Sequence, residues 1–207
     1  MKKWHIFSGG ELSDTDFIEI LAGEPVICAD RGLHHAQKLG IAPDIIVGDF
    51  DSFKGKLPEN TEILRSIPEK DDTDTMLAVK LAIDRGAEQI LLYGALGGRF
   101  DHTIANIQTL KYGQEHGCEI RIMDSQNEIM LQTAGTMRYK RRKEWYFSVF
   151  AYSEKLKINR LTGVKYPLSD AEITASFPIG VSNEIIEAEA ELSISSGTAL
   201  VIFSKNS

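Results

Sequence analysis

The chain has 207 residues, of which 43% are hydrophobic and 26% are charged, and its formal net charge is −7. This much apolar material suffices for one large or two small folded domains. The negative charge argues against a nucleic-acid-binding protein. Because no stretch approaches the roughly 18 consecutive apolar residues of a membrane helix, and the first residues lead straight into a strand-like segment, we expect a cytoplasmic protein without a membrane partner.

Short apolar segments alternate with helix-like segments over residues 1–125. We expect strands at 4–7, 25–29, 45–47, 62–64, 89–93 and 118–122, and helices at 14–22, 32–39, 73–85 and 102–116. Several of the helical segments end at a glycine, which often terminates a helix. Such alternation predicts an α/β domain with a mostly parallel sheet wrapped by helices.

The pattern changes after residue 125. Short segments rich in Ile, Val, Thr, Tyr and Phe follow one another at 127–133, 145–151, 155–159, 184–195 and 198–204. They predict an all-β sandwich or barrel. The acidic excess lies entirely in the first 125 residues, and the basic run at 138–143 is interpreted as a solvated turn or edge rather than a phosphate-binding patch. Cys28 and Cys118 lie in apolar runs without metal-binding spacing, so we expect buried thiols.

Polar residues follow several of the expected strands. Ligands of open α/β sheets bind at the carboxyl ends of the strands, so these positions carry the functional signal. They comprise 29–32, 48–52 and 94–102, together with 69–75 at the start of a helix. Each segment alone has an ordinary explanation, as a turn, a helix cap or a glycine-rich connection without phosphate-loop spacing.

The carboxylates Asp49 and Asp51 stand one residue apart directly after an expected strand. Carboxylates gathered from several strand ends at one sheet edge would repel each other unless a hard cation lay among them, and Mg²⁺ prefers oxygen ligands and phosphates. A triphosphate on that metal would meet Arg99 and the backbone amides of Gly97 and Gly98, near a helix start. The combination favours phosphoryl or pyrophosphoryl transfer.

Five motifs in register resemble those of bacterial thiamine pyrophosphokinases, and they cover nearly the whole chain. They are Gly48-Asp49-Phe50-Asp51-Ser52, the helix start Asp71-Asp72-Thr73-Asp74, the segment 94–102 with Asn106, the segment 161–168, and Val181-Ser182-Asn183-Glu184. The resemblance implies a homodimer with shared active sites that transfers pyrophosphate from ATP to the hydroxyl of thiamine with Mg²⁺. It also implies a catalytic, ATP- and Mg²⁺-binding domain at 1–125 and a β-sandwich at 126–207 for thiamine binding and dimerisation.

The resemblance also implies roles for individual residues. The metal ligands would be Asp49, Asp51, Asp71 and Asp74. The catalytic residues would be Asp49, Asp51, Asp74 and Arg99. ATP would be bound by Asp30, Arg31, Gly97, Gly98, Arg99, Asp101 and Asn106, and thiamine by Asp74, Tyr166, Ser182 and Asn183. Arg31 departs from the family pattern, in which glycine is frequent at this position.

Other functions remain open at this point. An Mg²⁺-dependent nucleotide hydrolase would use the same carboxylates, but it would leave Tyr166 and the Ser182-Asn183 pair without a role. A non-catalytic thiamine- or nucleotide-binding protein, or a structural interaction module, would have little reason to gather so many carboxylates.

Overall fold

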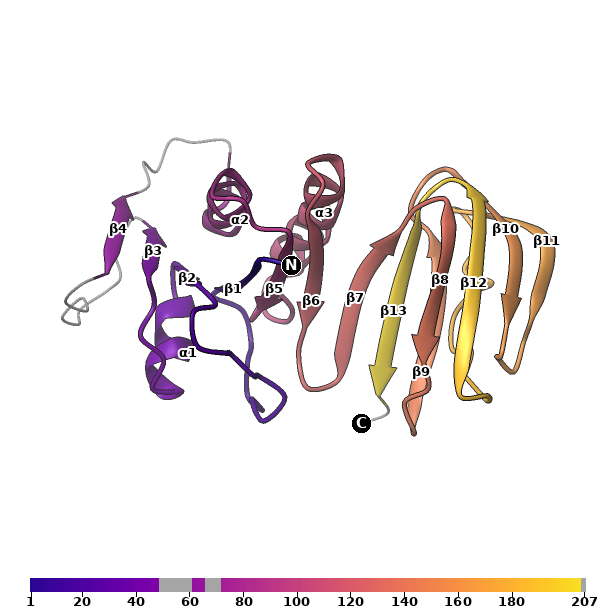
Figure 1. Ribbon diagram of the computed structural model, residues 1–207, viewed down its shortest axis with the longest axis horizontal. Helices are drawn as coiled ribbons and strands as arrows, with labels where there is room; N and C mark the ends of the chain where they lie inside the picture. Colours follow the sequence, from indigo (N-terminus) through magenta and orange to yellow (C-terminus); the bar gives the residue numbers. More distant parts are fainter. Residues whose placement is uncertain (49–60, 66–71, 206–207) are drawn as a thin grey trace. The chain divides into compact units, whose positions relative to one another are not determined.

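The structure is a computed structural model that describes residues 1–48, 61–65 and 72–205 (Figure 1). The chain forms two compact units, Met1–Ser125 and Gln126–Ser207. Three of the predicted metal ligands, Asp49, Asp51 and Asp71, lie outside the described residues. Within the described ranges, no helix is long and apolar enough to cross a membrane.

The first unit contains a parallel sheet. Its strands are β1 (Lys3–Phe7), β2 (Val26–Ala29), β3 (Ile45–Gly48), β4 (Glu62–Arg65), β5 (Gln89–Tyr93) and β6 (Glu119–Met123), in the spatial order β4-β3-β2-β1-β5-β6. All five pairings are parallel. The chain adds β2, β3 and β4 on one side of β1 and then returns to place β5 on the other side. The order of the strands therefore reverses between β1 and β5, which is a topological switch point.

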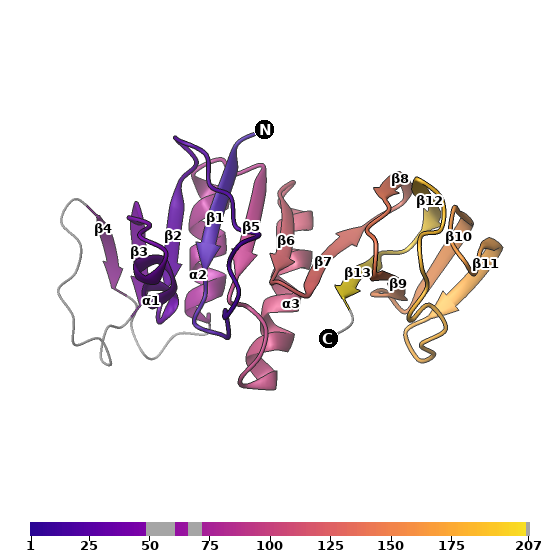
Figure 2. The ribbon, with the colours of Figure 1, turned by 90° about the horizontal axis from the view of Figure 1, so that it is seen from below.

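Helices cover both faces of this sheet. They are α1 (Gly32–Lys38), α2 (Asp74–Asp84) and α3 (Phe100–Glu115). Figures 1 and 2 show α2 and α3 on one face and α1 on the opposite face. A Cβ on Gly32 would lie 1.9 Å from the carbonyl oxygen of Phe7, so α1 can approach β1 this closely only because its first residue is glycine.

The predicted helix at 14–22 is wrong. This segment is irregular, with turns closed by hydrogen bonds from Ile18 N to Thr15 O (2.9 Å) and from Glu24 N to Leu21 O (3.0 Å). Phe17, Ile18 and Ile20 of this segment, together with Leu12, pack against the core cluster that contains Phe7, Leu33 and Tyr93. The apolar spacing thus reflects burial against the sheet rather than a helical face, and tertiary packing overrides the local pattern. The three other helices are confirmed, with ends within two residues of the predicted ones.

The second unit is an antiparallel β-sandwich. One sheet has the order β7-β13-β9, with β7 (Asn127–Gln132), β9 (Trp145–Ala151) and β13 (Ala199–Lys205). The other has the order β11-β10-β12-β8, with β8 (Gly135–Lys140), β10 (Lys155–Thr162), β11 (Leu168–Thr174) and β12 (Glu189–Ser196). One core contains residues of both sheets, among them Met130, Phe147, Leu156, Leu192 and Val201. The predicted fold class, an α/β unit followed by a β-sandwich, is confirmed.

Strands β8 and β11 were not predicted, because their residues are mostly exposed and carry no clear alternation. The basic run at 138–143 belongs to β8, an edge strand, and to the turn after it. Arg138 pairs with Glu191 on β12 (3.1 Å), and Arg142 pairs with Glu128. These cations are therefore engaged within the sandwich. In the predicted strand at 184–195, regular pairing begins only at Glu189.

Candidate active site

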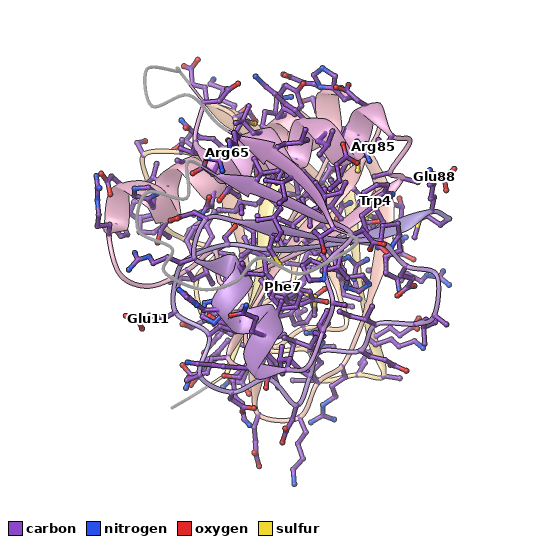
Figure 3. All side chains as sticks on the ribbon, turned by 90° about the vertical axis from the view of Figure 1, so that its left-hand side faces the viewer. Trp4, Phe7, Glu11, Arg65, Arg85 and Glu88 are labelled. Atoms are coloured by element: carbon purple, nitrogen blue, oxygen red, sulfur yellow. The ribbon has the colours of Figure 1, made fainter. Side chains whose placement is uncertain are left out.

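A cavity of about 400 Å³ opens in the first unit at the carboxyl ends of β1, β2 and β5. Segments 8–10, 29–31 and 94–99 contribute to its lining, together with 72–75 at the start of α2 and His102 and Asn106 on α3. Figure 3 shows the sense of the sheet: Glu11, just beyond the carboxyl end of β1, lies on the opposite side of the view from Arg85 and Glu88, which precede β5. The cavity therefore lies at the switch point between β1 and β5, where open parallel sheets bind ligands.

Two backbone segments that line the cavity are hydrogen-bonded to each other. The segment after β1 is hydrogen-bonded to the segment after β5, from Ser8 N to Tyr93 O (2.8 Å), from Gly10 N to Gly94 O (2.7 Å) and from Glu11 N to Leu96 O (3.0 Å). A Cβ on Gly10 would lie 2.5 Å from Gly94 O, so this contact requires glycine. Gly97 and Gly98 have φ values of +77° and +64°, a conformation that favours glycine. The two segments are thus locked together with little room for substitution.

Helices α1, α2 and α3 each contribute a side chain that is hydrogen-bonded to one of these two segments. From α1, His35 Nε2 donates to Gly10 O (2.8 Å). From α2, Thr75 Oγ1 lies 2.9 Å from Ser8 Oγ. From α3, buried Asn106 donates from Nδ2 to Ala95 O (2.8 Å).

Arg99 is the residue that precedes α3, and it lines the cavity. Its Nε and Nη2 donate to the Oδ1 (3.2 Å) and Oδ2 (2.6 Å) of Asp101, whose Oδ1 also accepts from His102 N (2.9 Å). The hydrogen bond from Arg99 lowers the pKa of Asp101, and the carboxylate in turn raises the pKa of the guanidinium. Asp101 itself is not among the residues that line the cavity, but its carboxylate is hydrogen-bonded to the guanidinium of Arg99, which does line it.

Three described carboxylates line the cavity: Asp30, Asp72 and Asp74. Asp30 has a positive φ of 48°. Asp74 is the first residue of α2, and the preceding Thr73 caps that helix by accepting from Met76 N (3.1 Å). Asp72 is paired with Lys80 (2.6 Å). The capped helix start therefore contributes Asp72 and Asp74 to the cavity lining.

The cavity is lined by the type of ligand atom that a hard cation prefers. Asp30 and Asp74 supply the carboxylate oxygens that Mg²⁺ prefers. Within residues 1–48, 61–65 and 72–205, no three His, Cys, Asp or Glu side chains are grouped so that they could hold a metal ion. The predicted ligands Asp49, Asp51 and Asp71 lie outside these ranges, and Mg²⁺ usually completes its shell with water and phosphate oxygens.

Three of the four residues predicted to contact thiamine, Tyr166, Ser182 and Asn183, lie in the second unit, whereas Asp74 belongs to the first. Buried Asn183 accepts at Oδ1 from Tyr166 N (3.0 Å) and Glu184 N (2.9 Å), and it donates from Nδ2 to Tyr166 O (2.9 Å). Ser182, with a positive φ of 57°, donates its N–H to Ser148 Oγ (3.0 Å). The side chain of Asn183 ties two loops together, while Tyr166 is exposed.

Sequence reasoning missed the contribution of β1 to the cavity. Ser8, Gly9 and Gly10 line it, as do Thr73 and Thr75 at the start of α2. The sequence could have indicated these residues, because ligands of open α/β sheets bind at the carboxyl ends of strands, and Ser8-Gly9-Gly10 directly follows β1. His102, in the first turn of α3, also lines the cavity.

Comparison with known proteins identifies the relatives of both units. The family model "Thiamin pyrophosphokinase, catalytic domain" matches residues 21–122, and the model "Thiamin pyrophosphokinase, vitamin B1 binding domain" matches residues 136–201. A thiamine pyrophosphokinase from Bacillus subtilis (strain 168) is 33% identical over 184 residues, which cover 85% of each chain. The chain belongs to the thiamin pyrophosphokinase family.

Solved structures of the family share the fold. The crystal structure of thiamine pyrophosphokinase from Bacillus subtilis has a TM-score of 0.90 at 29% identity and covers 100% of both chains. That of thiamin pyrophosphokinase from Geobacillus thermodenitrificans has a TM-score of 0.86 at 31% identity and covers 99% of this chain and 98% of the other. The resemblance inferred from the motifs is confirmed. The catalytic-domain match begins after Ser8-Gly9-Gly10, so this part of the cavity lies outside it.

Proposed function

We propose that this protein transfers the pyrophosphoryl group of ATP to the hydroxyl of thiamine, giving thiamine diphosphate and AMP. The observation that carries the proposal is the cavity at the switch point, which combines carboxylates, Arg99 and a glycine loop in a unit that belongs to this family. The first unit would bind ATP and Mg²⁺, and the second would bind thiamine and form the dimer.

The triphosphate would lie between the glycine loop and the start of α3. Gly97 and Gly98 offer backbone N–H groups, and the positive end of the α3 dipole favours an anion. Asp101 engages Nε and Nη2 of Arg99, so the two hydrogens on Nη1 can donate to a phosphate oxygen. Asp30 and Arg31 line the same cavity and would contribute to ATP binding.

Asp74 and Asp30 would hold Mg²⁺, together with Asp49, Asp51 and Asp71, which lie outside the described residues. When bound, the metal supplies positive charge that offsets the charge of the triphosphate. Asp74 suits this role because it lies at the capped start of α2, and Mg²⁺ demands regular geometry from its oxygen ligands.

In the transfer, the hydroxyl oxygen of thiamine loses its proton to water and forms a bond to the β-phosphorus of ATP. The bond from that phosphorus to the oxygen bridging to the α-phosphate breaks, and AMP leaves with that oxygen. Arg99 and the backbone amides stabilise the charge that grows on the phosphoryl oxygens during transfer. The protein's contribution is therefore mainly positioning and electrostatic stabilisation.

The acceptor residues Tyr166, Ser182 and Asn183 belong to the second unit, and we propose that the protein is a homodimer in which each active site takes residues from both chains. Large apolar side chains of the segment 177–186 in that unit are exposed, namely Phe177 (64%), Ile179 (58%), Val181 (53%) and Ile186 (51%). Exposed apolar side chains of this size often belong to an interface. A second copy of the chain is the partner that fits, because it would also bring further residues to Tyr166 and Ser182.

Product analysis tests the reaction. The protein is incubated with ATP, Mg²⁺ and thiamine, and the products are identified by ³¹P NMR. We expect AMP and thiamine diphosphate in equal amounts. ADP with thiamine monophosphate would contradict the site of attack, release of phosphate or pyrophosphate without a thiamine product would indicate a hydrolase, and binding without turnover would refute catalysis.

Mixing two inactive variants tests the shared site. Asp49→Asn removes a proposed metal ligand, and Tyr166→Ala/Ser182→Ala alters the acceptor side but keeps Asn183, which holds the loops. Each homodimer should be nearly inactive. After subunit exchange, verified with a mass tag on one variant, activity should partly return, because one site in each heterodimer is built from intact parts. Proven exchange without recovery of activity would place the whole site within one chain.

A further inference from the structure

A buried hydroxyl pair joins the end of β1 to the start of α2 at the cavity. Ser8 Oγ lies 2.9 Å from Thr75 Oγ1, and the two residues are only 2% and 9% exposed. They are 67 positions apart in the sequence. Both line the cavity, and Thr75 directly follows Asp74. A hydrogen bond here therefore acts on the helical turn that carries Asp74.

The Ser8 side of this link is anchored in the sheet. Ser8 N donates to Tyr93 O (2.8 Å), across the switch point between β1 and β5. The backbone of Gly94 packs so tightly on Ser8 that a Cβ at Gly94 would lie 2.5 Å from Ser8 O. Ser8 can shift only if both strand ends shift with it.

The Thr75 side of the link is stiff. Thr75 is β-branched, so its χ1 angle is restricted in a helix. Successive helical residues point about 100° apart, so fixing Thr75 towards Ser8 also fixes the direction in which the Cα–Cβ bond of Asp74 leaves the helix. The buried apolar contacts of α2, made by Ala78, Val79 and Ala82, lie further along the helix. The hydroxyl pair is thus a buried contact of α2 one residue from Asp74.

We propose that Ser8 and Thr75 are positioning residues that set the orientation of Asp74 and thereby the affinity of the cavity for magnesium-bound nucleotide. This inference rests on the proposed function, which assigns Asp74 to the metal and the triphosphate. The alternative is that the pair merely satisfies two buried hydroxyls and stabilises the fold.

The two roles differ in what they predict for nucleotide binding. The probe is α,β-methylene-ATP with Mg²⁺, which cannot be cleaved at the reacting bond, and affinity is measured by calorimetry. Thr75→Val keeps the shape but removes the hydroxyl, and we expect the dissociation constant to rise about tenfold. Thr75→Ser, the matched control, keeps the hydroxyl and should stay within about threefold of the unchanged protein.

A double-mutant cycle between Thr75 and Asp74 separates an effect on the orientation of Asp74 from an effect on the stability of the fold. In an Asp74→Asn background, Thr75→Val should cause no further loss of affinity, because the residue through which it acts is already altered. The double variant Ser8→Ala/Thr75→Val removes both buried hydroxyls and leaves neither unsatisfied, so its melting temperature should be close to that of the unchanged protein. Its affinity should nevertheless remain about tenfold lower.

Three results would overturn the inference: a melting temperature that falls in Thr75→Val with unchanged affinity, an equal loss of affinity from Thr75→Val in the Asp74→Asn background, or full affinity in the double variant. Failure of the proposed function is distinguishable. In that case the unchanged protein would give no thiamine diphosphate in the NMR assay, while the binding cycle would still decide whether Ser8 and Thr75 act through Asp74.

Discussion

Replacing Asn106 should both destabilise the first unit and impair transfer. Asn106 is 6% exposed, and its Nδ2 donates to Ala95 O at 2.8 Å. Asn106→Ala removes the donor and leaves a carbonyl without this partner, which costs about 1–3 kcal/mol of unfolding free energy. For a unit of this size, roughly 4 °C of melting temperature per kcal/mol gives a decrease of about 4–12 °C.

Asn106→Ala should also slow the transfer reaction, because Ala95 belongs to the loop that runs to Arg99. Loss of the hydrogen bond would let this loop move, and a displacement of the phosphate-binding groups by about 1 Å lowers kcat on the order of 10²-fold. We therefore expect kcat to fall more than the KM for thiamine rises.

The assay combines calorimetric melting with steady-state kinetics on three variants. Asn106→Asp preserves the shape but presents an acceptor to the carbonyl, so it should be at least as damaging as Asn106→Ala. Gln108→Ala, at an exposed position two residues on in α3, is the matched control and should stay within about 0.5 kcal/mol of the unchanged protein. An Asn106→Asp protein with unchanged melting temperature and kcat would refute the reasoning.

Three further predictions concern the first unit. Gly10→Ala places a Cβ 2.5 Å from a backbone carbonyl of the facing loop, so the unfolding free energy should fall by about 1–3 kcal/mol, and an unchanged calorimetric transition would contradict this. Burial raises the pKa of Glu24, but hydrogen bonds from a lysine, a backbone N–H and a histidine outweigh it and lower the pKa to about 2. Its stabilising effect should be complete above about pH 4.5 and lost as the pH falls towards 2, so Glu24→Gln should flatten the decline in stability over this range, as followed by circular dichroism. Burial raises the pKa of Cys28 to about 12 and that of Cys118 to about 11, so neither thiol should react rapidly with iodoacetamide at pH 8 until the protein unfolds.

Much of the architecture can be predicted from the sequence alone. Apolar runs that alternate with helical segments predict a parallel sheet, because each pattern is local and repeats the geometry of its own element. The glycine loop with Arg99, the α2 start with Asp74, and Asp30 could likewise be identified as strand-end or helix-start positions. These positions indicated phosphoryl or pyrophosphoryl transfer, and the family motifs then indicated the specific reaction.

Tertiary structure alone decided which of these positions meet. Packing of α2 against β1 and its neighbours in the sheet brings Thr75 within hydrogen-bonding distance of Ser8, although 67 positions separate them in the sequence. The apolar residues at 17, 18 and 20 pack on the core without a helix, and the exposed strand β8 is held at the edge of a sheet by its pairing with β12. The physical reason is that local propensities differ by only about 1 kcal/mol per residue, whereas burial and pairing between distant segments are summed over the whole unit and therefore outweigh them.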